Sequence, residues 1–335
     1  MAPDRRITVP TTDPALTEAL TQGLAQVEAA LHGAVKSDYP FVTEASRHLV
    51  DAGGKRFRPL LVLLAAQFGD PGAPGVVPAA VVVELTHLAT LYHDDVMDEA
   101  TMRRGAPSAN LRWDNTVAIL TGDFLFAKAS ELLADLGTEA VRIQAQTFER
   151  LCTGQIRETV GARPGDDLIE HYLSVVADKT GSLIATSGRF GAMLSGAPEP
   201  VVDVLTRFGE RIGIAFQLAD DLLDVTSEAG ESGKTPGTDL REGVETLPVL
   251  HARRLADPAR AADLRLLELL DGDLTDDSRR AEALALLRRH PAVTAAREDL
   301  LRWGREARDV LDPLPDIPAK RALQALCDAT VRRVA

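Results

Sequence analysis

Residues 84–98 read ELTHLATLYHDDVMD, an apolar segment that ends in a cluster of aspartates. Its apolar residues recur three or four positions apart, which is the spacing of one face of an α-helix. The same spacing recurs along the chain, for example at Val117, Leu120 and Phe124, whereas alternating β-branched residues are scarce. The pattern predicts an all-α protein.

Breaks rich in glycine and proline divide the chain into roughly ten or more helices. No segment between them is long or polar enough to act as a linker between domains. We therefore expect a single domain over residues 1–335, with roughly the first 15 residues flexible.

The composition is that of an ordinary globular protein. Of 335 residues, 45% are hydrophobic and 26% are charged, which excludes a disordered chain and a collagen-like one. The 50 acidic side chains outnumber the 37 basic ones, and the resulting charge of -13 repels phosphate backbones and anionic lipid surfaces. We therefore expect no nucleic-acid partner.

Cysteine content and hydropathy indicate the compartment. Cys152 and Cys327 are too few for a disulfide framework and lack the spacing of a metal site, which is typical of a reducing compartment. The first 14 residues lack the apolar core of an export signal. The most apolar segment, Val76–Tyr92, is interrupted by a proline, a glutamate and a histidine, so we interpret it as a buried helix. We expect a cytoplasmic protein without an integral membrane segment.

Two acidic clusters with the same spacing follow apolar helical segments. They are Asp94-Asp95-Val96-Met97-Asp98 and Asp220-Asp221-Leu222-Leu223-Asp224. Positions i, i+1 and i+4 share one side of a helix, so the carboxylates of each cluster lie close together. One such cluster is as often an ordinary solvated face, but two copies beside a core carry like charges that a hard divalent cation would neutralise. Because Mg²⁺ prefers a few carboxylates together with water and phosphate oxygens, the two clusters indicate a Mg²⁺-dependent phosphate site.

Four basic motifs complete the pattern. They are GGKRFRP at 53–59, MRRGAPS at 102–108, KTG at 179–181 and GKTPGTD at 233–239. Their glycines let backbone amides approach an anion, arginine offers bidentate contacts to phosphate, and lysine offers a point charge. Each motif alone is more often solvated surface, and the last lacks the preceding glycine and strand of a P-loop. Together with the acidic clusters, they indicate a pocket for small diphosphates.

In this combination and order, the sequence resembles the trans-isoprenyl (polyprenyl) diphosphate synthases. The matching segments run from Gly53 to Leu250 and also include GDFLFAKA at 122–129, FQLADDLLD at 216–224 and TLPVL at 246–250. The resemblance implies the isoprenoid synthase fold, a single all-α bundle around a deep central cavity, usually in a homodimer. It also implies a prenyltransferase that condenses isopentenyl diphosphate, head to tail (1′–4), with an allylic geranyl, farnesyl or geranylgeranyl diphosphate.

The resemblance also implies roles for the matching residues. The expected metal ligands, for roughly three Mg²⁺ ions with substrate bound, are Asp94, Asp98 and Asp220. Asp95, Asp221, Asp224 and Asp239 would lie in or near the coordination shell, and the expected catalytic residues are the six aspartates of the two clusters and Lys179. The expected contacts of the allylic diphosphate are Arg103, Lys179, Thr180, Gln217 and Lys234. The expected pocket for isopentenyl diphosphate comprises Lys55, Arg58, His87 and Arg104. Because metal ions and cations stabilise the departing diphosphate, the reaction needs no protein nucleophile.

The sequence departs from the family pattern in two places. Val244 stands where the family often has lysine, in the loop after the second cluster. In the run Gly154-Gln155-Ile156-Arg157-Glu158, the acid and the amide are exchanged. The expected chemistry is the same.

The residues one helical turn before the first cluster predict the length of the product. Bulky side chains here stop the growing chain in this family, whereas this sequence has the small residues Ala89 and Thr90, about 5.4 Å along the helix from Asp94. We expect a medium- or long-chain all-trans polyprenyl diphosphate, with a geranylgeranyl or farnesyl diphosphate synthase as the alternative. A class I terpene cyclase would have no use for the pocket of Lys55 and Arg58, and a non-catalytic partner subunit would lack the metal aspartates.

Overall fold

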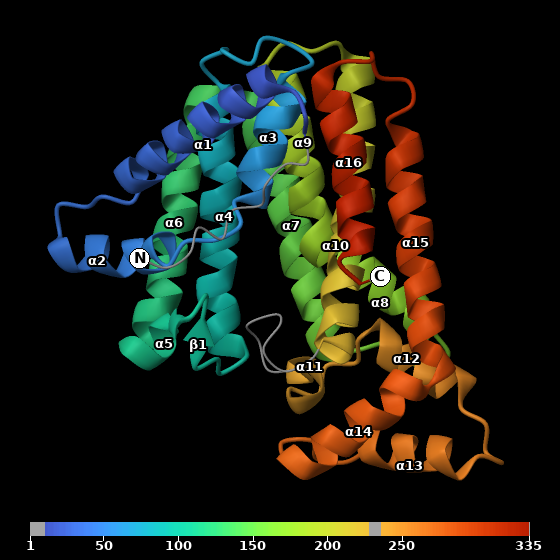
Figure 1. Ribbon diagram of the computed structural model, residues 1–335. Coiled ribbons are helices and arrows are strands. Elements are labelled where there is room, and N and C mark those ends of the chain that lie inside the picture. Colours follow the sequence, from blue (N-terminus) through green and yellow to red (C-terminus); the bar gives the residue numbers. More distant parts are fainter. Residues whose placement is uncertain (1–10, 228–235, 335) are drawn as a thin grey trace. The chain divides into compact units, whose positions relative to one another are not determined.

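The computed structural model describes residues 11–227 and 236–334 (Figure 1). Within these residues the regular structure is helical apart from one hairpin, in which β1 (Met102–Arg103) pairs antiparallel with β2 (Ala106–Pro107). The predicted all-α class is confirmed. The chain divides into two compact units: unit 1 comprises Met1–Glu149, Leu183–Gly209 and Leu311–Ala325, and unit 2 comprises Arg150–Ser182, Glu210–Val310 and Leu326–Ala335.

Unit 1 holds α1 (Pro14–Ala34), α2 (Pro40–Asp51), α3 (Phe57–Ala66), α4 (Val76–Met97), α5 (Ala109–Arg112), α6 (Asn115–Leu136) and most of α9 (Ser182–Leu194). Helix α4 packs against α1, α3 and α6, as Figure 1 shows. Aspartates begin two of these helices, because the carboxylates of Asp13 and Asp114 accept hydrogen bonds from the backbone N–H groups of Leu16 and Val117. Such caps satisfy amides that have no partner within their helix.

The core of unit 1 is formed by α3 and α4. Apart from Arg58, every side chain of α3 is buried. Gly191 of α9 lies so close to α3 that a Cβ atom there would stand 2.2 Å from the carbonyl oxygen of Val62, so only glycine fits. At the end of α4, Met97 and Asp98 are exposed. The first aspartate cluster therefore lies where α4 leaves the core.

Among the described residues, α4 is the one helix that is long and apolar enough to cross a membrane. In the structure, however, 67% of its most apolar window is buried. The core helix of a globular protein passes the same test of length and composition. The hydropathy of α4 thus matches its central place in unit 1, as we interpreted it from the sequence.

Unit 2 holds the second part of α7 (Thr138–Val160), α8 (Leu168–Val176), the π-helical turn η1 (Ala177–Gly181), the later part of α10 (Glu199–Thr226), α11 (Thr238–Arg241), α12 (Leu247–Leu255), α13 (Ala261–Leu270), α14 (Asp277–Arg289), α15 (Pro291–Val310) and the end of α16 (Pro318–Arg332). Helix α12 packs against α8 and α15, and α13 packs against α14. Arg288 of α14 donates hydrogen bonds to the carbonyl oxygens of Val225 and Ser227, each at 2.7 Å. These bonds fix the carboxyl-terminal end of α10, which carries the second aspartate cluster.

Candidate active site

The first aspartate cluster occupies the last turn of α4, in unit 1. The N–H of Asp98 donates a hydrogen bond to the carbonyl oxygen of Asp94 at 2.8 Å, so the two residues lie one turn apart, as their spacing predicted. Asp94 is half-buried and Asp98 is exposed, whereas Asp95 is fully buried. Asp94 and Asp98 are therefore the members of the cluster that reach solvent, as ligands of an exchangeable metal ion must.

Asp95 is held by Arg103 of the hairpin. The Nε atom of Arg103 donates to Oδ1 of Asp95 at 2.6 Å, while Oδ2 is buried without a hydrogen-bond partner within the described chain. Burial raises the pKa of Asp95, and the charge of Arg103 opposes that rise. Burying a carboxylate oxygen without a hydrogen-bond partner costs free energy, and a cation bound at this oxygen would reduce that cost.

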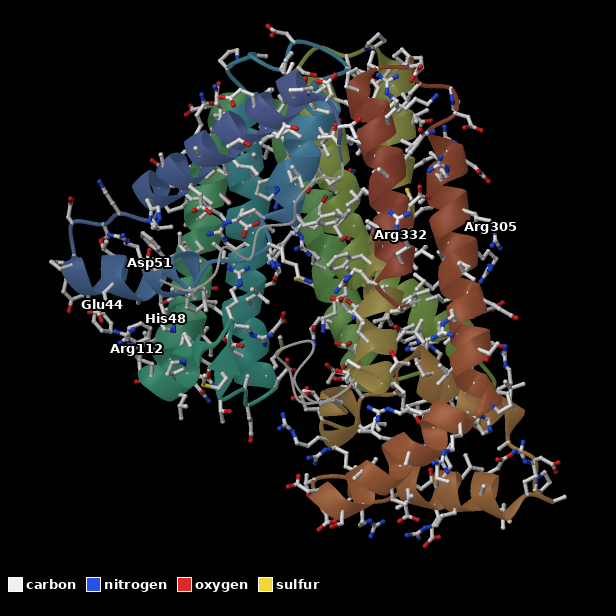
Figure 2. All side chains as sticks on the ribbon, in the orientation of Figure 1. Glu44, His48, Asp51, Arg112, Arg305 and Arg332 are labelled. Atoms are coloured by element: carbon white, nitrogen blue, oxygen red, sulfur yellow. The ribbon has the colours of Figure 1, made fainter. Side chains whose placement is uncertain are left out.

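The hairpin that carries Arg104 is fastened to α2. Arg104 and the glycine after it have φ values of 54° and 82°, the signs of a type I′ turn, whose twist suits a tight hairpin. The ring Nε2 of His48 lies 2.7 Å from the carbonyl oxygen of Pro107, and Arg112 donates to Glu44 at 2.7 Å. Figure 2 shows the side chains of Glu44, His48 and Arg112 gathered together. Helix α2 thereby sets the position of the hairpin.

Arg104 closes onto the loop between α2 and α3, which we call the glycine loop (residues 52–56). Its Nη1 atom donates to the carbonyl oxygens of Leu49, at 3.0 Å, and Gly53. The guanidinium lies against Gly54, where a Cβ atom would stand 2.8 Å from Cζ, so only glycine allows this contact. The two basic motifs at 53–59 and 102–108 are therefore in direct contact.

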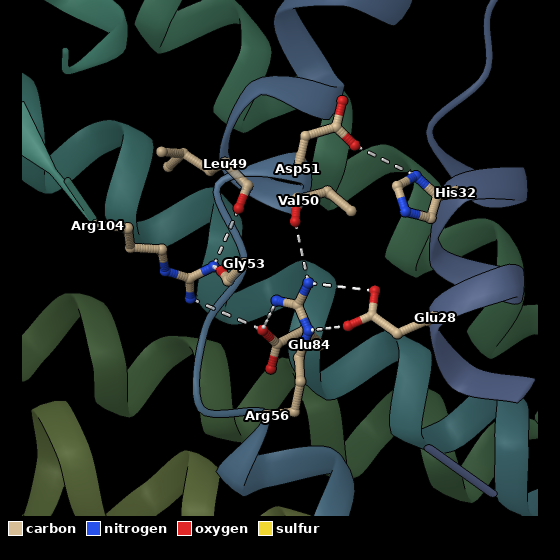
Figure 3. A network of polar contacts seen from close by, with 9 residues as sticks. All are labelled: Glu28, His32, Leu49, Val50, Asp51, Gly53, Arg56, Glu84 and Arg104. Carbon is tan, nitrogen blue, oxygen red and sulfur yellow. Dashed lines mark hydrogen bonds and ion pairs between the residues drawn. The ribbon is translucent and has the colours of Figure 1, made fainter. Parts of the chain in front are cut away.

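Arg56 of the glycine loop is buried between two glutamates, as Figure 3 shows. Its Nε donates to Glu28 at 2.6 Å, its Nη1 donates to Glu84 at 2.8 Å, and its Nη2 donates to the carbonyl oxygen of Val50 at 3.1 Å. The side chains of Arg56 and Glu84 are each only 2% exposed. Oε1 of Glu84 also lies 3.8 Å from Nη2 of Arg104.

Arg58 and His87 form a cationic pocket, in which the charges of Arg58 and Arg104 outnumber that of the facing carboxylate, Glu84. Burial lowers the pKa of Arg58 to about 10, Glu84 opposes that effect, and Arg104 adds to it. Burial and the charges of Arg58 and Arg104 hold the pKa of His87 well below its ordinary value. The Nε atom of Arg58 is buried and makes no hydrogen bond with the described residues. Since a buried donor without a partner is costly and positive charge is in excess here, the pocket suits an anion. Lys55, which we grouped with it, is exposed on the glycine loop.

The second aspartate cluster lies at the end of α10, in unit 2. Asp220 is half-buried and accepts a hydrogen bond from Nη2 of Arg333 at 2.7 Å. The same guanidinium lies 5.1 Å from the centre of the Phe216 ring. The guanidinium of Arg333 thus forms an ion pair with the carboxylate that we expect to bind metal.

Asp221 is buried and doubly hydrogen-bonded. The Tyr172 hydroxyl donates to Oδ2, and Nε2 of Gln217 donates to Oδ1 at 3.0 Å. The hydroxyl of Thr180 donates to Oε1 of the same glutamine at 3.3 Å. Burial raises the pKa of Asp221 to about 6, although both hydrogen bonds act to lower it. Thr180 and Gln217, which we expect at the allylic diphosphate, are therefore linked by hydrogen bonds to Asp221 of the second cluster.

Asp224 organises the segment that follows the cluster. Its carboxylate accepts hydrogen bonds from the backbone N–H groups of Thr238, at 3.2 Å, and Asp239, at 3.1 Å. It therefore caps the short helix α11 and brings the end of the motif at 233–239 back to α10. Lys234 of this motif lies outside the described residues.

The KTG motif lies on the π-helical turn η1. Nζ of Lys179 donates to Oε2 of Glu158 at 2.5 Å. Asp178 accepts hydrogen bonds from Nε of Arg150 at 2.9 Å and from Nη1 of Arg157 at 3.2 Å, which anchors the turn to α7. Single π-helical turns often occur at functional sites. The run at 154–158, which departs from the family pattern, supplies two of these partners.

The two residues expected to control product length have different surroundings. Ala89 is fully buried, and its carbonyl oxygen lies only 3.1 Å from the position that a Cβ atom on Gly122 of α6 would take. Thr90 is half-buried, and its hydroxyl donates to the carbonyl oxygen of His87 at 2.8 Å. Packing between α4 and α6 is therefore tight at Ala89, whereas Thr90 is partly open to solvent.

The carboxylates of the two clusters fit a hard divalent cation that binds together with substrate. Among the described residues, no three acidic, histidine or cysteine side chains are gathered closely enough to hold a metal ion by themselves. Mg²⁺ is usually bound through one or two carboxylates, with water and substrate phosphates completing the shell. The solvent-reaching Asp94 and Asp98, and the unsatisfied Oδ2 of Asp95, match this mode of binding.

From the sequence we assign no role to Arg56, Glu84, Tyr172 or Arg333. In the structure Glu84, Tyr172 and Arg333 lie against the expected site residues Arg104, Asp221 and Asp220, respectively. Arg56 pairs with Glu84. A signal was present for Glu84, because it is the one carboxylate in the apolar run 81–93. Arg333 belongs to the basic pair Arg332-Arg333, and such a pair is more often part of a frayed, solvated segment. No local pattern marks Tyr172.

Comparisons with known proteins agree with these features. The family model described as Polyprenyl synthetase matches residues 39–287. The chain is 52% identical to the nonaprenyl diphosphate synthase of Mycobacterium tuberculosis, over 96% of this chain and 95% of that protein.

Solved structures give the same result. A geranylgeranyl pyrophosphate synthase from Corynebacterium glutamicum, complexed with calcium and isoprenyl diphosphate, matches with a TM-score of 0.87 and 48% identity, over 98% of this chain and 100% of that one. A decaprenyl diphosphate synthase from Rhodobacter capsulatus matches with a TM-score of 0.86 and 39% identity, over 96% of this chain and 99% of that one.

Proposed function

Because the chain belongs to the polyprenyl synthetase family and is a prenyltransferase, we propose that it condenses isopentenyl diphosphate with an allylic diphosphate. The fold is the isoprenoid synthase fold. The proposed product is a medium- or long-chain all-trans polyprenyl diphosphate, formed head to tail.

The observation that carries the proposal is the arrangement of His87 and Asp94 along α4. They are seven positions apart, so they lie on the same face of the helix, about 10 Å apart along its axis. His87 belongs to the cationic pocket with Arg58 and Arg104, and Asp94 belongs to the carboxylate cluster that reaches solvent. One helix face thus offers a site for a bare diphosphate beside a site for a metal-bound one, which is what two diphosphate substrates of one reaction require.

In the proposed reaction, the protein holds the two diphosphates and the protein side chains form no covalent intermediate. Mg²⁺ bound by Asp94, Asp98 and Asp220 would supply positive charge to the diphosphate that leaves the allylic substrate. The proposed further contacts of that diphosphate are Arg103, Lys179, Thr180, Gln217 and Lys234. Lys55, Arg58, His87 and Arg104 would hold isopentenyl diphosphate so that its C4 bonds to the allylic C1 as the C1–O bond breaks. The proton then lost from C2 passes to the released diphosphate.

The length of the product is supported by the relatives and by α4. The relatives at high identity include a nonaprenyl diphosphate synthase, and the similar structures include a decaprenyl diphosphate synthase. Ala89 and Thr90 present no bulky side chain one turn before the first cluster. Both features favour a product longer than farnesyl diphosphate.

An exposed apolar surface on unit 1 supports the proposed homodimer. Ile119 and Leu120 of α6 and Val141 and Phe148 of α7 are all exposed, with Leu120 60% accessible. The Phe148 ring lies 4.4 Å from that of Phe126, so the surface is continuous across the two helices. An apolar surface of this kind marks an interaction site, and a second copy of the chain is the partner we propose.

The proposal has three further parts, carried over from the sequence. They are a single functional domain that combines units 1 and 2, roughly three Mg²⁺ ions with substrate bound, and a cytoplasmic location.

The proposed function is tested by incubating the purified chain with farnesyl diphosphate, labelled isopentenyl diphosphate and Mg²⁺. The products are sized after removal of the diphosphate. We expect isopentenyl-dependent release of diphosphate and products longer than geranylgeranyl; without that release the condensation is refuted, and a sole product of farnesyl or geranylgeranyl length refutes only the chain-length part. Asp94→Ala and chelation by EDTA should each abolish turnover, whereas Asp309→Ala, at an exposed aspartate of α15, should leave it unchanged.

A further inference from the structure

Glu84 is approached by two arginines from two different loops (Figure 3). Nη1 of Arg56, from the glycine loop, lies 2.8 Å from its Oε1 atom, and Nη2 of Arg104, from the hairpin, lies 3.8 Å from the same atom. Both arginines have positive φ values, of 49° and 54°. Residues with a side chain avoid this left-handed region, and they persist there only where the surroundings hold them.

Both arginines are held in this conformation by hydrogen bonds and ion pairs. Arg56 donates hydrogen bonds to Glu28, Glu84 and the carbonyl oxygen of Val50. Arg104 donates to the carbonyl oxygens of Leu49, at the end of α2, and Gly53, in the glycine loop. Glu84 is the fully buried carboxylate that faces both guanidinium groups. Without it, two buried positive charges would repel each other, and the contact between the two loops would weaken.

The contact between the glycine loop and the hairpin determines where the side chains of the cationic pocket lie. Lys55 precedes Arg56 in the chain, and Arg58 follows it by two residues, so the left-handed turn at Arg56 sets the directions in which both cations leave the loop. Arg58 makes no compensating hydrogen bond of its own through Nε. Its position therefore depends on the backbone that Arg56 anchors.

We propose that Glu84 is a positioning residue: through Arg56 and Arg104 it fixes the glycine loop against the hairpin, so that Lys55 and Arg58 are preorganised for the diphosphate of isopentenyl diphosphate. The identity of that ligand rests on the proposed function. Glu84 itself contacts no substrate. Its effect is on the affinity for isopentenyl diphosphate, because the glycine loop carries Lys55 and Arg58. The hairpin, which also carries Arg103, is held independently by the contact between His48 and Pro107.

Two variants that remove charges of opposite sign distinguish a positioning role from a simple effect of local charge. Glu84→Gln removes a negative charge near an anion site, and Arg56→Gln removes a positive one. If these residues acted only through their charge, the KM for isopentenyl diphosphate would fall in the first variant and rise in the second. If they act by positioning, the KM rises in both, and the double variant is no worse than the worse single variant.

We expect both single variants to raise the KM for isopentenyl diphosphate by about tenfold to 100-fold, the range seen when residues that orient metal ligands are removed. The KM for farnesyl diphosphate should be unchanged. Equal changes in both KM values, or opposite changes in the two variants, overturn the proposal. The matched control is the exposed pair Arg265 and Glu282, also 2.8 Å apart, for which Glu282→Gln and Arg265→Gln should leave both KM values unchanged.

A variant with an apolar pair in place of the ion pair tests the proposal without leaving a buried charge unpaired. The double variant R56M/E84L replaces the buried ion pair with apolar side chains of similar size, a change that usually preserves stability. It should remain folded and still show the raised KM for isopentenyl diphosphate; a KM equal to that of the wild type overturns the proposal.

Binding of inorganic diphosphate without Mg²⁺, measured by calorimetry, reports the pocket even if condensation is absent. The wild type should bind, and R56M/E84L should bind about tenfold or more weakly. Wild-type binding without turnover would refute the proposed function alone. Equal affinity of the two proteins would refute the role of Glu84.

Discussion

The hydroxyl of Tyr172 donates a hydrogen bond to the buried carboxylate of Asp221, although the two residues lie 49 positions apart in the chain. Gln217 donates to the other carboxylate oxygen, so the side chain of Asp221 has one favoured orientation. This orientation is set by residues of α8 and α10 within unit 2. The second aspartate cluster is therefore preorganised by a residue outside its own motif.

Tyr172→Phe removes this donor without changing the shape of the ring. A hydrogen bond to a charged group contributes about 1.5–3 kcal/mol, so we expect kcat/KM for the allylic substrate to fall about tenfold to 100-fold. Steady-state kinetics measures the change in kcat/KM, and circular dichroism shows whether the variant is folded. The control is Tyr39→Phe, at a tyrosine that is 64% exposed. A folded Tyr172→Phe variant with wild-type kinetics would show that Tyr172 does not hold Asp221 for catalysis.

Thr90→Phe should shorten the product. A phenylalanine would project from the α4 face one turn, about 5.4 Å, before Asp94 and block the growing chain. Product sizing by thin-layer chromatography, with Thr90→Ser as the control, measures the effect. Ala89→Phe should also shorten the product without abolishing turnover, but the tight contact at Gly122 predicts a lower thermal stability for that variant than for Thr90→Phe. An unchanged product distribution in both variants would contradict this role.

The neutral state of His87 makes stability depend on pH. Its pKa is well below the ordinary value of 6.5 in the folded protein, so below that pH the unfolded chain binds a proton that the folded protein does not. The free energy of unfolding therefore decreases as the pH falls below about 6.5, by at most about 1.4 kcal/mol per pH unit for this one group. Urea unfolding between pH 6.5 and 5.5 should show a shallower decrease for His87→Gln than for the wild type. Identical slopes would refute the prediction.

The exposed apolar surface of α6 and α7 should be an interface. Leu120→Glu together with Phe148→Glu places charges on both helices of this surface, so we expect the dimer to dissociate to a monomer. Analytical ultracentrifugation over a range of concentrations measures the change. Leu264→Glu, at an exposed leucine of α13, is the matched control and should leave the assembly unchanged. A double variant that sediments as the wild type does would exclude this surface.

The helical fold was predictable because its signal is local. Apolar residues three and four positions apart define α4 and α6, and aspartates such as Asp114 mark helix starts within a few residues of the bonds they make. The spacing of Asp94 and Asp98 predicted that they lie one turn apart, and the structure confirms it.

The supporting residues of the site were not predictable because their partners are distant in the chain. Arg333 and Asp220 are 113 positions apart, and Arg56 and Glu84 are 28 apart. A single sequence gives no spacing rule for such pairs. The lone carboxylate in the apolar run of α4 was visible, but the spacing alone does not show that two arginines surround it.

The contact between Arg333 and Asp220 bears on how the enzyme should be handled in the laboratory. Because Arg333 pairs with this expected metal ligand, an affinity tag fused within two residues after it would begin close to the second aspartate cluster. A polyhistidine tag there would also bring a competing chelator to the divalent cation. Purification handles for kinetic work therefore belong at the other end of the polypeptide.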